Sequence, residues 1–387
     1  MKRRKICVFV GSRANYSSIK SVMQAVRSHP KLILQVVTGA SALLDRFGRV
    51  DDLIREDGFQ PDYSFHNIVE GETPTTMSKS TGLGVIEMSM ILDNLKPDQL
   101  IVVGDRFEVM AVTIAAAYMN ICIVHTMGGE VSGTIDESIR HAITKFAHIH
   151  FPANEDAKKR IIKLGEDPEF VYNCGCPRMD LVKEELTNDS SALLSDIFEK
   201  YGGVGSALDL SKPFLLVSQH PVTTEYGQNR RQIEETLSAL NELKIQTLLL
   251  WPNADAGSDH ISKGIRTFRE QNQPKWLHVF KNLPTNYYIH LLKKTDCLVG
   301  NSSSGLREGA FIGTPVVNVG TRQKRRMRSN NVMDVGYSAK EIKSAIEKQC
   351  ERGPYEKSPI YGNGTAGLQI AEILVNSNPP IQKTIVY

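Results

Sequence analysis

The chain contains 387 residues, which at roughly 150 residues per domain predicts two domains. Hydrophobic residues make up 41% of it and charged residues 23%, which is ordinary for a globular protein and argues against a disordered, collagen-like or coiled-coil chain. The 46 Lys and Arg against 43 Asp and Glu leave a formal net charge of +3, too small to indicate a nucleic-acid partner, so we expect a small-molecule ligand.

Short β-branched segments alternate with longer segments of helical periodicity, a pattern typical of βαβ units and a parallel sheet. In the first half, the predicted strands are 6–10, 32–38, 99–103, 122–125, 148–151 and 170–172. The predicted helices between them are 17–27, 84–95, 108–119, 137–146 and 156–164.

The alternation breaks at residues 174–180, where Gly175 and Pro177 interrupt the periodicity, and a polar stretch follows at 187–191. Beyond this break, the predicted strands are 214–218, 247–251, 277–280, 297–300 and 315–319. The predicted helices there are 228–243, 259–270, 286–294 and 306–311.

Two successive α/β halves without a GxGxxG fingerprint predict two Rossmann-like, doubly wound domains facing a cleft, and argue against a plain dinucleotide dehydrogenase. We expect an N-terminal domain over 1–180, a C-terminal domain over 190–364 and a tail over 365–387 that packs back on the first domain. In such sheets, ligands bind beyond the carboxyl ends of the strands. The residues that follow each strand therefore form the candidate site.

Nothing in the sequence predicts a membrane partner, because no apolar run approaches the roughly 18 residues that a membrane helix needs. The apolar block 6–10 after the basic start is too short for a signal peptide. Six cysteines are too few for a disulfide scaffold in a chain of this length, and we expect a cytoplasmic protein. His148 and His150 lack further ligands at metal-site spacing, so we expect no metal.

Polar residues follow the first strands. Arg13 and Ser17 lie in a turn before a helix, where backbone N–H groups and a guanidinium can bind a phosphate. The strand that ends at Val103 leads to Asp105 and Arg106. This adjacent carboxylate and guanidinium either serve the site or form a structural ion pair at the start of the next helix.

Carboxylates cluster after the next strand, where Glu130, Asp136 and Glu137 fall within one short segment. Clustered carboxylates can divide the roles of acid and base between them. We also expect Asp136 to cap the helix 137–146, which does not exclude catalysis by Glu130. On that helix, Glu137 and His141 are four residues apart and share a face.

In the second half, His220 follows a strand that Pro221 prevents from continuing, and a histidine there can act as an acid or pair with a phosphate. Asn253 follows the next strand. Arg322 opens a basic run after the last strand and can neutralise a phosphate, whereas the rest of the run is expected to line the rim of the cleft.

The most specific signal is the loop at 300–308. Its serines, including Ser302 and Ser303, precede Gly305, which is predicted to open a helix, so that hydroxyls and N–H groups converge on an anion. Glu308 lies one turn into that helix, suitably placed for a ribose. A simple capped turn is the alternative interpretation.

Taken in order, the segments GDRFE, GGEVSGTIDESIRHAITK, HPVTTE, PNADAG, GNSSSGLRE and GTPVVNVGTRQ resemble the hydrolysing UDP-N-acetylglucosamine 2-epimerases over about residues 5–364. The resemblance implies a glycosyltransferase-B-like pair of domains with the nucleotide mainly on the second. It further implies a UDP-sugar substrate, no cofactor, and a homodimer or homotetramer.

The implied reaction converts UDP-N-acetylglucosamine and water into N-acetylmannosamine and UDP and feeds sialic-acid synthesis. It proceeds by removal of the C2 proton, loss of UDP to give a glycal, and addition of water. The resemblance implies that the catalytic residues are Asp105, Glu130, Asp136 and His220. It implies nucleotide binding by Arg13, Ser17, Arg106, His220, Asn253, Ser302, Ser303, Glu308 and Arg322.

One position departs from the family pattern, because many members have a catalytic glutamate where this chain has Met127. A thioether cannot transfer a proton. We therefore expect Glu130 or Asp136 to be the base, and Met127, with Glu137 and His141, to lie in or beside the sugar pocket.

Three alternatives remain. The same chemistry can act on another UDP- or GDP-linked acetamido sugar, such as a diacetylbacillosamine. A transferase of the same architecture would need an acceptor. A protein that only binds a nucleotide sugar is the third, and Met127 permits it.

Overall fold

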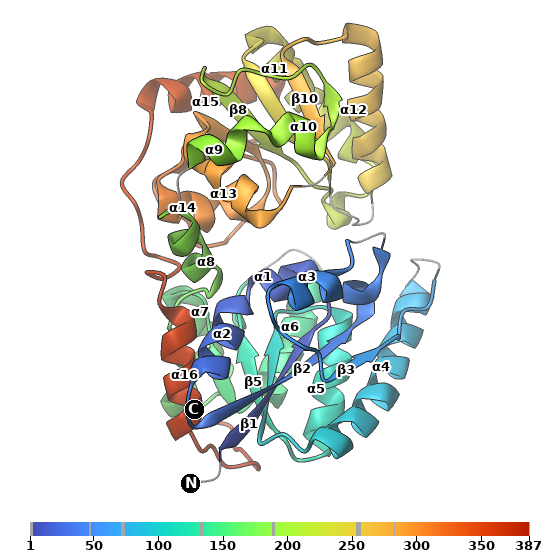
Figure 1. Cartoon of the computed structure of the whole chain (residues 1–387). Coiled ribbons are helices and arrows are strands. Elements are labelled where there is room, and N and C mark those ends of the chain that lie inside the picture. Colours follow the sequence, from blue (N-terminus) through green and yellow to red (C-terminus); the bar gives the residue numbers. More distant parts are fainter. Residues whose placement is uncertain are drawn as a thin grey trace. The chain divides into compact units, whose positions relative to one another are not determined.

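The computed structural model describes residues 3–45, 48–70, 74–131, 135–187, 190–252, 257–281 and 283–386. The chain forms two compact units (Figure 1). Unit 1 comprises Met1–Val131, Ile135–Leu181 and the C-terminal Tyr361–Tyr387, and unit 2 includes Val182–Ile360. The predicted domain bounds of 1–180, 190–364 and 365–387 stay a prediction, which limited proteolysis can test.

Unit 1 is built on a sheet whose described strands follow the order β3-β2-β1-β4-β5-β6, all of them parallel. The strands are β1 (Arg4–Val10), β2 (Leu32–Gly39), β3 (Tyr63–Phe65), β4 (Gln99–Val103), β5 (Cys122–Thr126) and β6 (Ile149–Phe151). The chain runs outward from β1 to β3 and then returns to the other side of β1 with β4. This reversal is the switch point at which doubly wound sheets bind ligands.

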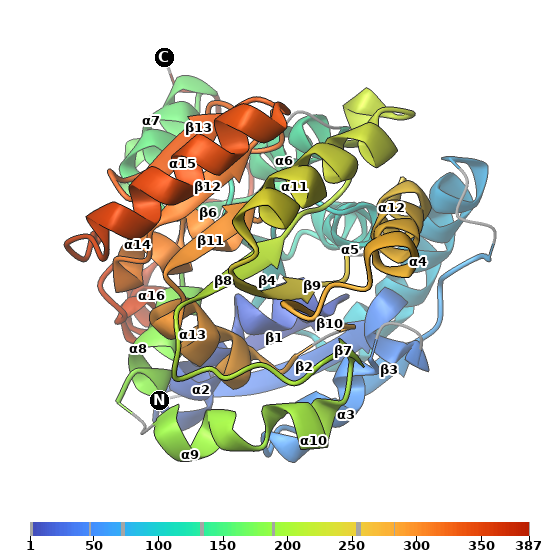
Figure 2. The same cartoon turned by 90° about the horizontal axis from the view of Figure 1, so that it is seen from above.

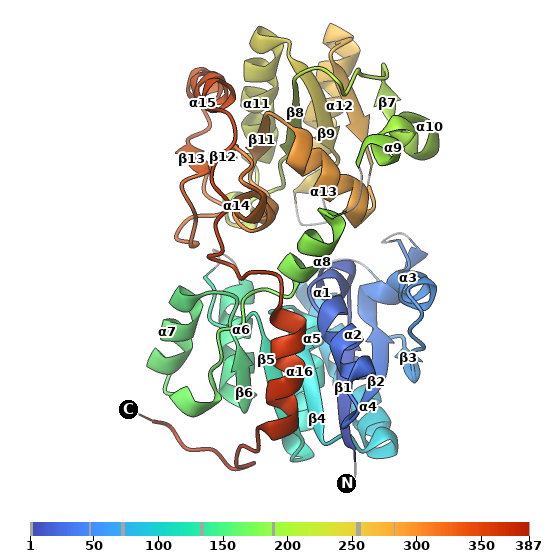
Figure 3. The same ribbon diagram turned by 60° about the vertical axis from the view of Figure 1, so that its left-hand side comes forward.

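Helices cover both faces of this sheet. The described helices are α1 (Arg13–Ser17), α2 (Lys20–Ser28), α3 (Val50–Glu56), α4 (Pro74–Leu95), α5 (Phe107–Tyr118), α6 (Ile135–Phe146), α7 (Glu155–Lys163), α16 (Ala366–Asn376) and the 3₁₀ turns η1 (Ala40–Leu43) and η3 (Pro168–Phe170). One apolar core joins α4, α5 and α6 to the sheet. On the other face α16 packs against α2 (Figure 3), and a Cβ on Gly367 would stand only 2.7 Å from the Ser21 backbone.

Unit 2 repeats the same order. Its described strands run β13-β12-β11-β8-β9-β10-β7, with only the edge strand β7 antiparallel. The strands are β7 (Val204–Gly205), β8 (Phe214–Ser218), β9 (Gln246–Leu250), β10 (Leu277–Phe280), β11 (Cys297–Gly300), β12 (Val316–Val319) and β13 (Val332–Val335). The switch point of unit 2 therefore lies between β8 and β11.

The sheet of unit 2 also has helices on both faces. The described helices are α9 (Ser190–Ser195), α10 (Ile197–Tyr201), α11 (Asn229–Leu243), α12 (Ser258–Asn272), α13 (Thr285–Lys294), α14 (Glu308–Ile312), α15 (Ala339–Arg352) and the turns η4 (Thr223–Glu225) and η5 (Ser303–Gly305). Helix α8 (Arg178–Glu185) begins in unit 1 and ends in unit 2. Figure 2 shows α15, α11 and α12 side by side over one face, where they bury one apolar core. A second core lies under α9, α10 and α13. The predicted α/β fold with two Rossmann-like, doubly wound halves is confirmed.

Two predicted elements are wrong. Residues 170–172 do not form a strand, because Asp167 caps a 3₁₀ turn over Pro168–Phe170 and only Val171 forms a bridge, with His150. The predicted helix 17–27 is divided into α1 and α2. Within the described residues, no helix has the length and apolar composition required to cross a bilayer.

Candidate functional site

Arg13 lies at the carboxyl end of β1 in unit 1. It is half buried, and no other described residue provides its guanidinium with a hydrogen bond or an ion pair. Burial lowers the pKa of Arg13, but a guanidinium keeps its charge in proteins. Because no described acidic residue pairs with it, this half-buried guanidinium is well placed to bind the phosphate that the sequence predicts at this position.

Asn15 joins the two strands at the switch point of unit 1. Its side-chain amide donates to the carbonyl of Val103 (3.2 Å), and its Oδ1 accepts from the Gly11 N–H (3.2 Å). Sequence reasoning missed Asn15, because β1 and β4 are distant in sequence. Ser17, which it did select, donates its hydroxyl hydrogen to the Arg13 carbonyl (3.1 Å) within α1.

Arg106 and Asp105 each form an ion pair with a different residue. Arg106 Nε donates to Glu108 Oε1 (2.8 Å), and Glu108 is almost fully buried against Gly11. This pair forms because Glu108 begins the buried side of α5, whereas Asp105 points toward α6.

Arg140 of α6 connects two candidate catalytic residues. Its side chain is 2% exposed, and it forms an ion pair with the Asp105 carboxylate while Nη1 donates to the Glu130 carbonyl (2.7 Å). One buried guanidinium therefore fixes the loop after β4 and the loop after β5. Sequence reasoning did not select Arg140, although it lies one helical turn after Asp136 and so faces the same side of α6.

The loop after β5 is shaped by close packing at two glycines. A Cβ on Gly128 would stand 2.8 Å from His125 Nδ1, and one on Gly129 would stand 2.4 Å from the Ala157 carbonyl oxygen. His125 is buried, with Nε2 hydrogen-bonded to the Gly104 carbonyl (2.8 Å). Burial lowers the pKa of His125 to about 3, so its neutral ring has a structural role.

Met127 occupies this loop in a left-handed backbone conformation, with φ of +62°. Its N–H donates to the Phe151 carbonyl (2.9 Å), and 9% of the residue is exposed. Only a minority of non-glycine residues adopt this conformation, which therefore marks a constrained position. Glu130, three residues later, is also buried.

The remaining acidic candidates lie on α6. This helix begins at Ile135, so Asp136 belongs to its first turn and the prediction that Asp136 caps the helix is wrong. Glu137 Oε1 and His141 Nε2 are 3.7 Å apart, as their spacing on one face predicts.

His220 lies just beyond β8 in unit 2 and is fixed by Asn301, which follows β11. The His220 N–H donates to Asn301 Oδ1 (2.7 Å), and Asn301 Nδ2 donates to the His220 carbonyl (2.8 Å). This reciprocal pair joins the strand ends at the switch point. His220 Nε2 lies 3.3 Å from the Ser218 hydroxyl. Sequence reasoning selected His220 but missed Asn301.

The serine loop follows β11. The hydroxyls of Ser302 and Ser304 hydrogen-bond to each other (2.9 Å), whereas no described residue hydrogen-bonds the half-buried Ser303 hydroxyl. Gly305 ends a 3₁₀ turn, and the following helix begins at Glu308, so the predicted helix start at Gly305 is wrong. Glu308 is the buried first residue of α14.

Arg322 is held at this same switch point. Its Nη1 donates to the Asn301 carbonyl (3.2 Å), which also accepts from Gln323 Nε2 (2.8 Å). The loop after β12 is thus attached to the end of β11. Asn253, another predicted nucleotide-binding residue, lies outside the described residues.

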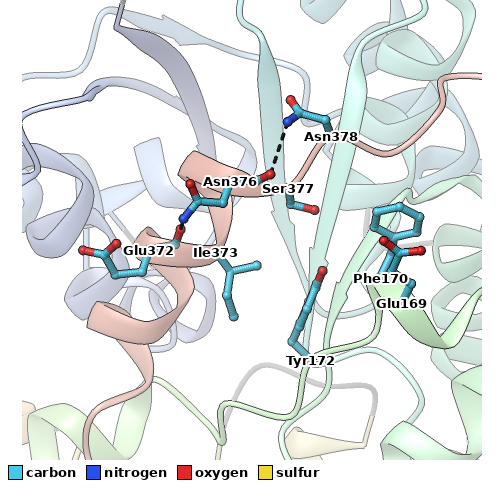
Figure 4. A pocket seen from close by; sticks show the side chains of 8 residues that line it. All are labelled: Glu169, Phe170, Tyr172, Glu372, Ile373, Asn376, Ser377 and Asn378. Carbon is cyan, nitrogen blue, oxygen red and sulfur yellow. Dashed lines mark hydrogen bonds between the residues drawn. The ribbon is translucent and has the colours of Figure 1, made fainter.

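Unit 1 also contains a pocket of about 480 Å³, which is separate from the candidate residues (Figure 4). Its lining residues are Glu169, Phe170, Tyr172, Glu372, Ile373, Asn376, Ser377 and Asn378. Arg4 at the start of β1 hydrogen-bonds to Ser377 and Asn378, so the pocket lies toward the amino ends of the strands, away from the candidate residues. In the described part of the chain, no group of three His, Cys, Asp or Glu side chains is placed to bind a metal.

Comparison with known proteins agrees with the resemblance seen in the motifs. The sequence matches the UDP-N-acetylglucosamine 2-epimerase family over residues 24–375. The UDP-N-acetylglucosamine 2-epimerase of Neisseria meningitidis serogroup B is 30% identical over 378 residues, 97% of this chain and 95% of that protein. The UDP-N,N'-diacetylbacillosamine 2-epimerase (hydrolyzing) of Legionella pneumophila is 30% identical over 372 residues, with 96% and 95% covered.

The fold is also shared. The crystal structure of UDP-GlcNAc 2-epimerase from Neisseria meningitidis bound to UDP-GlcNAc superimposes with a TM-score of 0.80, covering 96% of this chain and all of that chain at 18% identity. The family match spans most of the chain, and the two sheets with their switch points have the matching architecture. The chain belongs to the UDP-N-acetylglucosamine 2-epimerase family.

Proposed function

We propose that this protein is a hydrolysing 2-epimerase that converts UDP-N-acetylglucosamine and water into N-acetylmannosamine and UDP. The main structural support for this proposal is the buried guanidinium of Arg140. It contacts both the Asp105 carboxylate and the Glu130 carbonyl, and so holds two candidate catalytic residues in place. Family membership supports the nucleotide-sugar substrate, and the word "hydrolyzing" in the name of the Legionella relative supports the use of water.

The proposed reaction begins at C2 of the sugar. Glu130 or Asp136 accepts the C2 proton, and the electrons of that bond form a C1–C2 double bond as the C1–oxygen bond to UDP breaks. Water then adds its hydroxyl to C1, and a proton returns to C2 on the opposite face. Asp105, held by Arg140, assists proton transfer. All steps are proton transfers, an elimination and a hydration, so the proposal includes no cofactor and no metal.

Unit 2 supplies the proposed nucleotide site. His220 and Arg322 both lie at the switch point beside Asn301, and the Ser303 hydroxyl is available to a phosphate. Positive charge stabilises the negative charge that develops on departing UDP. We assign Glu308 to the ribose.

Another acetamido sugar on UDP or GDP is the second candidate substrate. Met127 favours it, because the family glutamate is absent at a constrained position of the loop. The diacetylbacillosamine relative supports it as well. Comparison of kcat/KM for UDP-N-acetylglucosamine with the values for UDP- and GDP-diacetylbacillosamine decides between the two substrates.

The proposal is tested by product analysis without any acceptor. Purified protein incubated with UDP-N-acetylglucosamine is expected to release UDP and N-acetylmannosamine in equal amounts, as followed by ¹H NMR and chromatography. Asp105→Asn, which keeps the side-chain size but removes the carboxylate, is expected to lower this rate by about 100-fold or more. UDP release that requires an added acceptor would indicate a transferase. If no UDP is released from any of these substrates, the protein binds a nucleotide sugar without converting it.

The product also defines a place in metabolism. N-Acetylmannosamine is a neutral amino sugar, and we propose that a sialic-acid synthesis in the cytoplasm consumes it.

A further inference from the structure

Tyr288 of α13 contacts the serine loop of unit 2 from a neighbouring helix. Helix α13 lies beside α14 (Figure 1), and the Tyr288 ring packs against the apolar core under α9, α10 and α13. The Tyr288 hydroxyl forms a hydrogen bond with the Ser304 hydroxyl. Ser304 is 7% exposed, so this contact lies beneath the surface of the loop. Because close packing fixes the ring, the phenol hydroxyl meets the loop at one defined point.

The hydrogen bonding continues from Ser304 to Ser302. The two serine hydroxyls are 2.9 Å apart, and the Ser304 backbone N–H also donates to Ser302 Oγ (3.4 Å). Tyr288, Ser304 and Ser302 therefore form one chain of hydroxyls. This chain starts on α13, passes through a buried serine and ends at Ser302, which is partly exposed.

The chemistry of the three hydroxyls gives the chain a direction. A phenol is more acidic than an aliphatic hydroxyl, so it is the stronger donor and the weaker acceptor. Tyr288 therefore donates to Ser304, and the Ser304 hydroxyl donates to Ser302. A serine oxygen accepts two hydrogen bonds, and Ser302 Oγ then receives both from Ser304, one from the hydroxyl and one from the N–H. Ser302 can then act toward a ligand only as a donor.

We propose that Tyr288 is a positioning residue of the nucleotide site, which acts through Ser304 to make Ser302 a hydrogen-bond donor to a phosphate of the nucleotide. This inference rests on the proposed function, because that function supplies the UDP-sugar. Phosphate oxygens are acceptors, and a hydrogen bond to a charged oxygen is stronger than one between neutral groups. A serine whose own oxygen is already occupied presents its hydrogen to the phosphate. Removal of the Tyr288 hydroxyl allows Ser302 to turn its hydrogen toward Ser304 instead.

Binding of UDP and of uridine, measured by calorimetry and by ligand-observed NMR, tests the proposal. In Tyr288→Phe, which keeps the ring, we expect the Kd for UDP to rise about tenfold, the loss of one hydrogen bond to a charged group. The Kd for uridine is expected to stay unchanged, because uridine has no phosphate, whereas a general defect of the site would weaken both ligands. Tyr287→Phe is the matched control on α13. The Tyr287 hydroxyl donates to Asp196 (3.3 Å) instead, and we expect its loss to leave both Kd values unchanged.

A double-mutant cycle tests whether Tyr288 acts through Ser302. Ser302→Ala alone is expected to raise the Kd for UDP about tenfold. Addition of Tyr288→Phe to Ser302→Ala is expected to raise it by at most about twofold more, because two groups that act through one contact are not additive. The proposal is overturned if the unmodified protein does not bind UDP, if Tyr288→Phe leaves the Kd for UDP unchanged or weakens uridine equally, or if the two substitutions are additive. The proposed function fails separately, if the unmodified protein binds UDP but forms no N-acetylmannosamine.

Discussion

Met127 is buried and adopts a left-handed backbone conformation, at the position where the family resemblance implies a glutamate. Met127→Glu introduces a group that can accept a proton in that loop. We expect it to raise kcat for UDP-N-acetylglucosamine by about tenfold or more, because a positioned acid or base contributes at least that much. Met127→Gln, which has the same size but no acid, serves as the control. A loss of turnover, or an equal gain in both variants, would argue against this role.

Arg140 has two acceptors on different loops, and no other residue type can replace its forked geometry. Arg140→Met leaves the Asp105 carboxylate without its cation and frees the Glu130 loop. We expect kcat to fall by about 100-fold, with a smaller change in KM, because misplacement of catalytic groups acts on turnover. Steady-state kinetics measures both. Arg230→Met, in an exposed pair with Glu234, is expected to change neither, and an equal effect would contradict the assignment.

At the scale of the elements, the central strands were predictable because each is a short apolar run bounded by turn residues. β4 and β8 were predicted at their observed bounds. β7 and β13 were not, because they are short edge strands with partly or fully exposed residues and thus lack a buried pattern. The false strand 170–172 contains strand-forming residues, but Asp167 and Pro168 determine the local structure.

Candidate residues that directly follow strands were predictable, because strand ends in a doubly wound sheet gather at one edge. The contacts that fix these candidate residues in place could not be predicted from the sequence. Arg140 and Asp105 are 35 residues apart, and Asn301 and His220 are 81 apart. Those contacts depend on the order of strands in each sheet, which no local pattern in the sequence determines.

Glu225 connects two loops of unit 2. It accepts hydrogen bonds from Thr321 after β12, from the Tyr337 hydroxyl (3.0 Å) and from Gln232 on α11 (2.5 Å). Burial raises the pKa of Tyr337 to about 12, so its hydroxyl stays protonated and donates. Because Thr321 precedes Arg322, this carboxylate fixes the arginine assigned to the phosphate.

We therefore expect Glu225→Gln to weaken UDP binding by about tenfold, the loss of one or two charge-assisted hydrogen bonds. Isothermal titration calorimetry with UDP measures the Kd. Glu234→Gln on α11, an exposed residue, is the matched control and is expected to bind UDP with unchanged Kd. An unchanged Kd for UDP in Glu225→Gln would show that this residue does not contribute to nucleotide binding.

At the scale of the whole molecule, the C-terminal segment is anchored on unit 1 through Glu166. This buried carboxylate forms ion pairs with Lys145 (2.6 Å) and with Lys383 of the tail, and it hydrogen-bonds to His150. Burial alone would raise the pKa of Glu166, but these three donors outweigh it and hold the pKa at about 2. Because the folded value lies below that of the unfolded chain, Glu166 stabilises the fold above about pH 4.

This stabilisation is lost as the pH falls from about 4 toward 2. We expect Glu166→Gln to lower the free energy of unfolding at pH 7 by about 2–3 kcal/mol, with the difference from the unmodified protein shrinking below pH 4. Urea unfolding at a series of pH values measures it. Glu169→Gln, an exposed neighbour, is the control. A difference independent of pH would contradict the assignment.

The central claim, that the chain removes the C2 proton and expels UDP before water adds, is tested most directly by isotope incorporation. Purified protein is incubated with UDP-N-acetylglucosamine in deuterium oxide without an acceptor, and the products are analysed by NMR and mass spectrometry. We expect equal amounts of UDP and N-acetylmannosamine, with one deuterium at C2 of the sugar. Release of UDP together with unlabelled N-acetylglucosamine would contradict it, because simple hydrolysis leaves the C2–H bond intact.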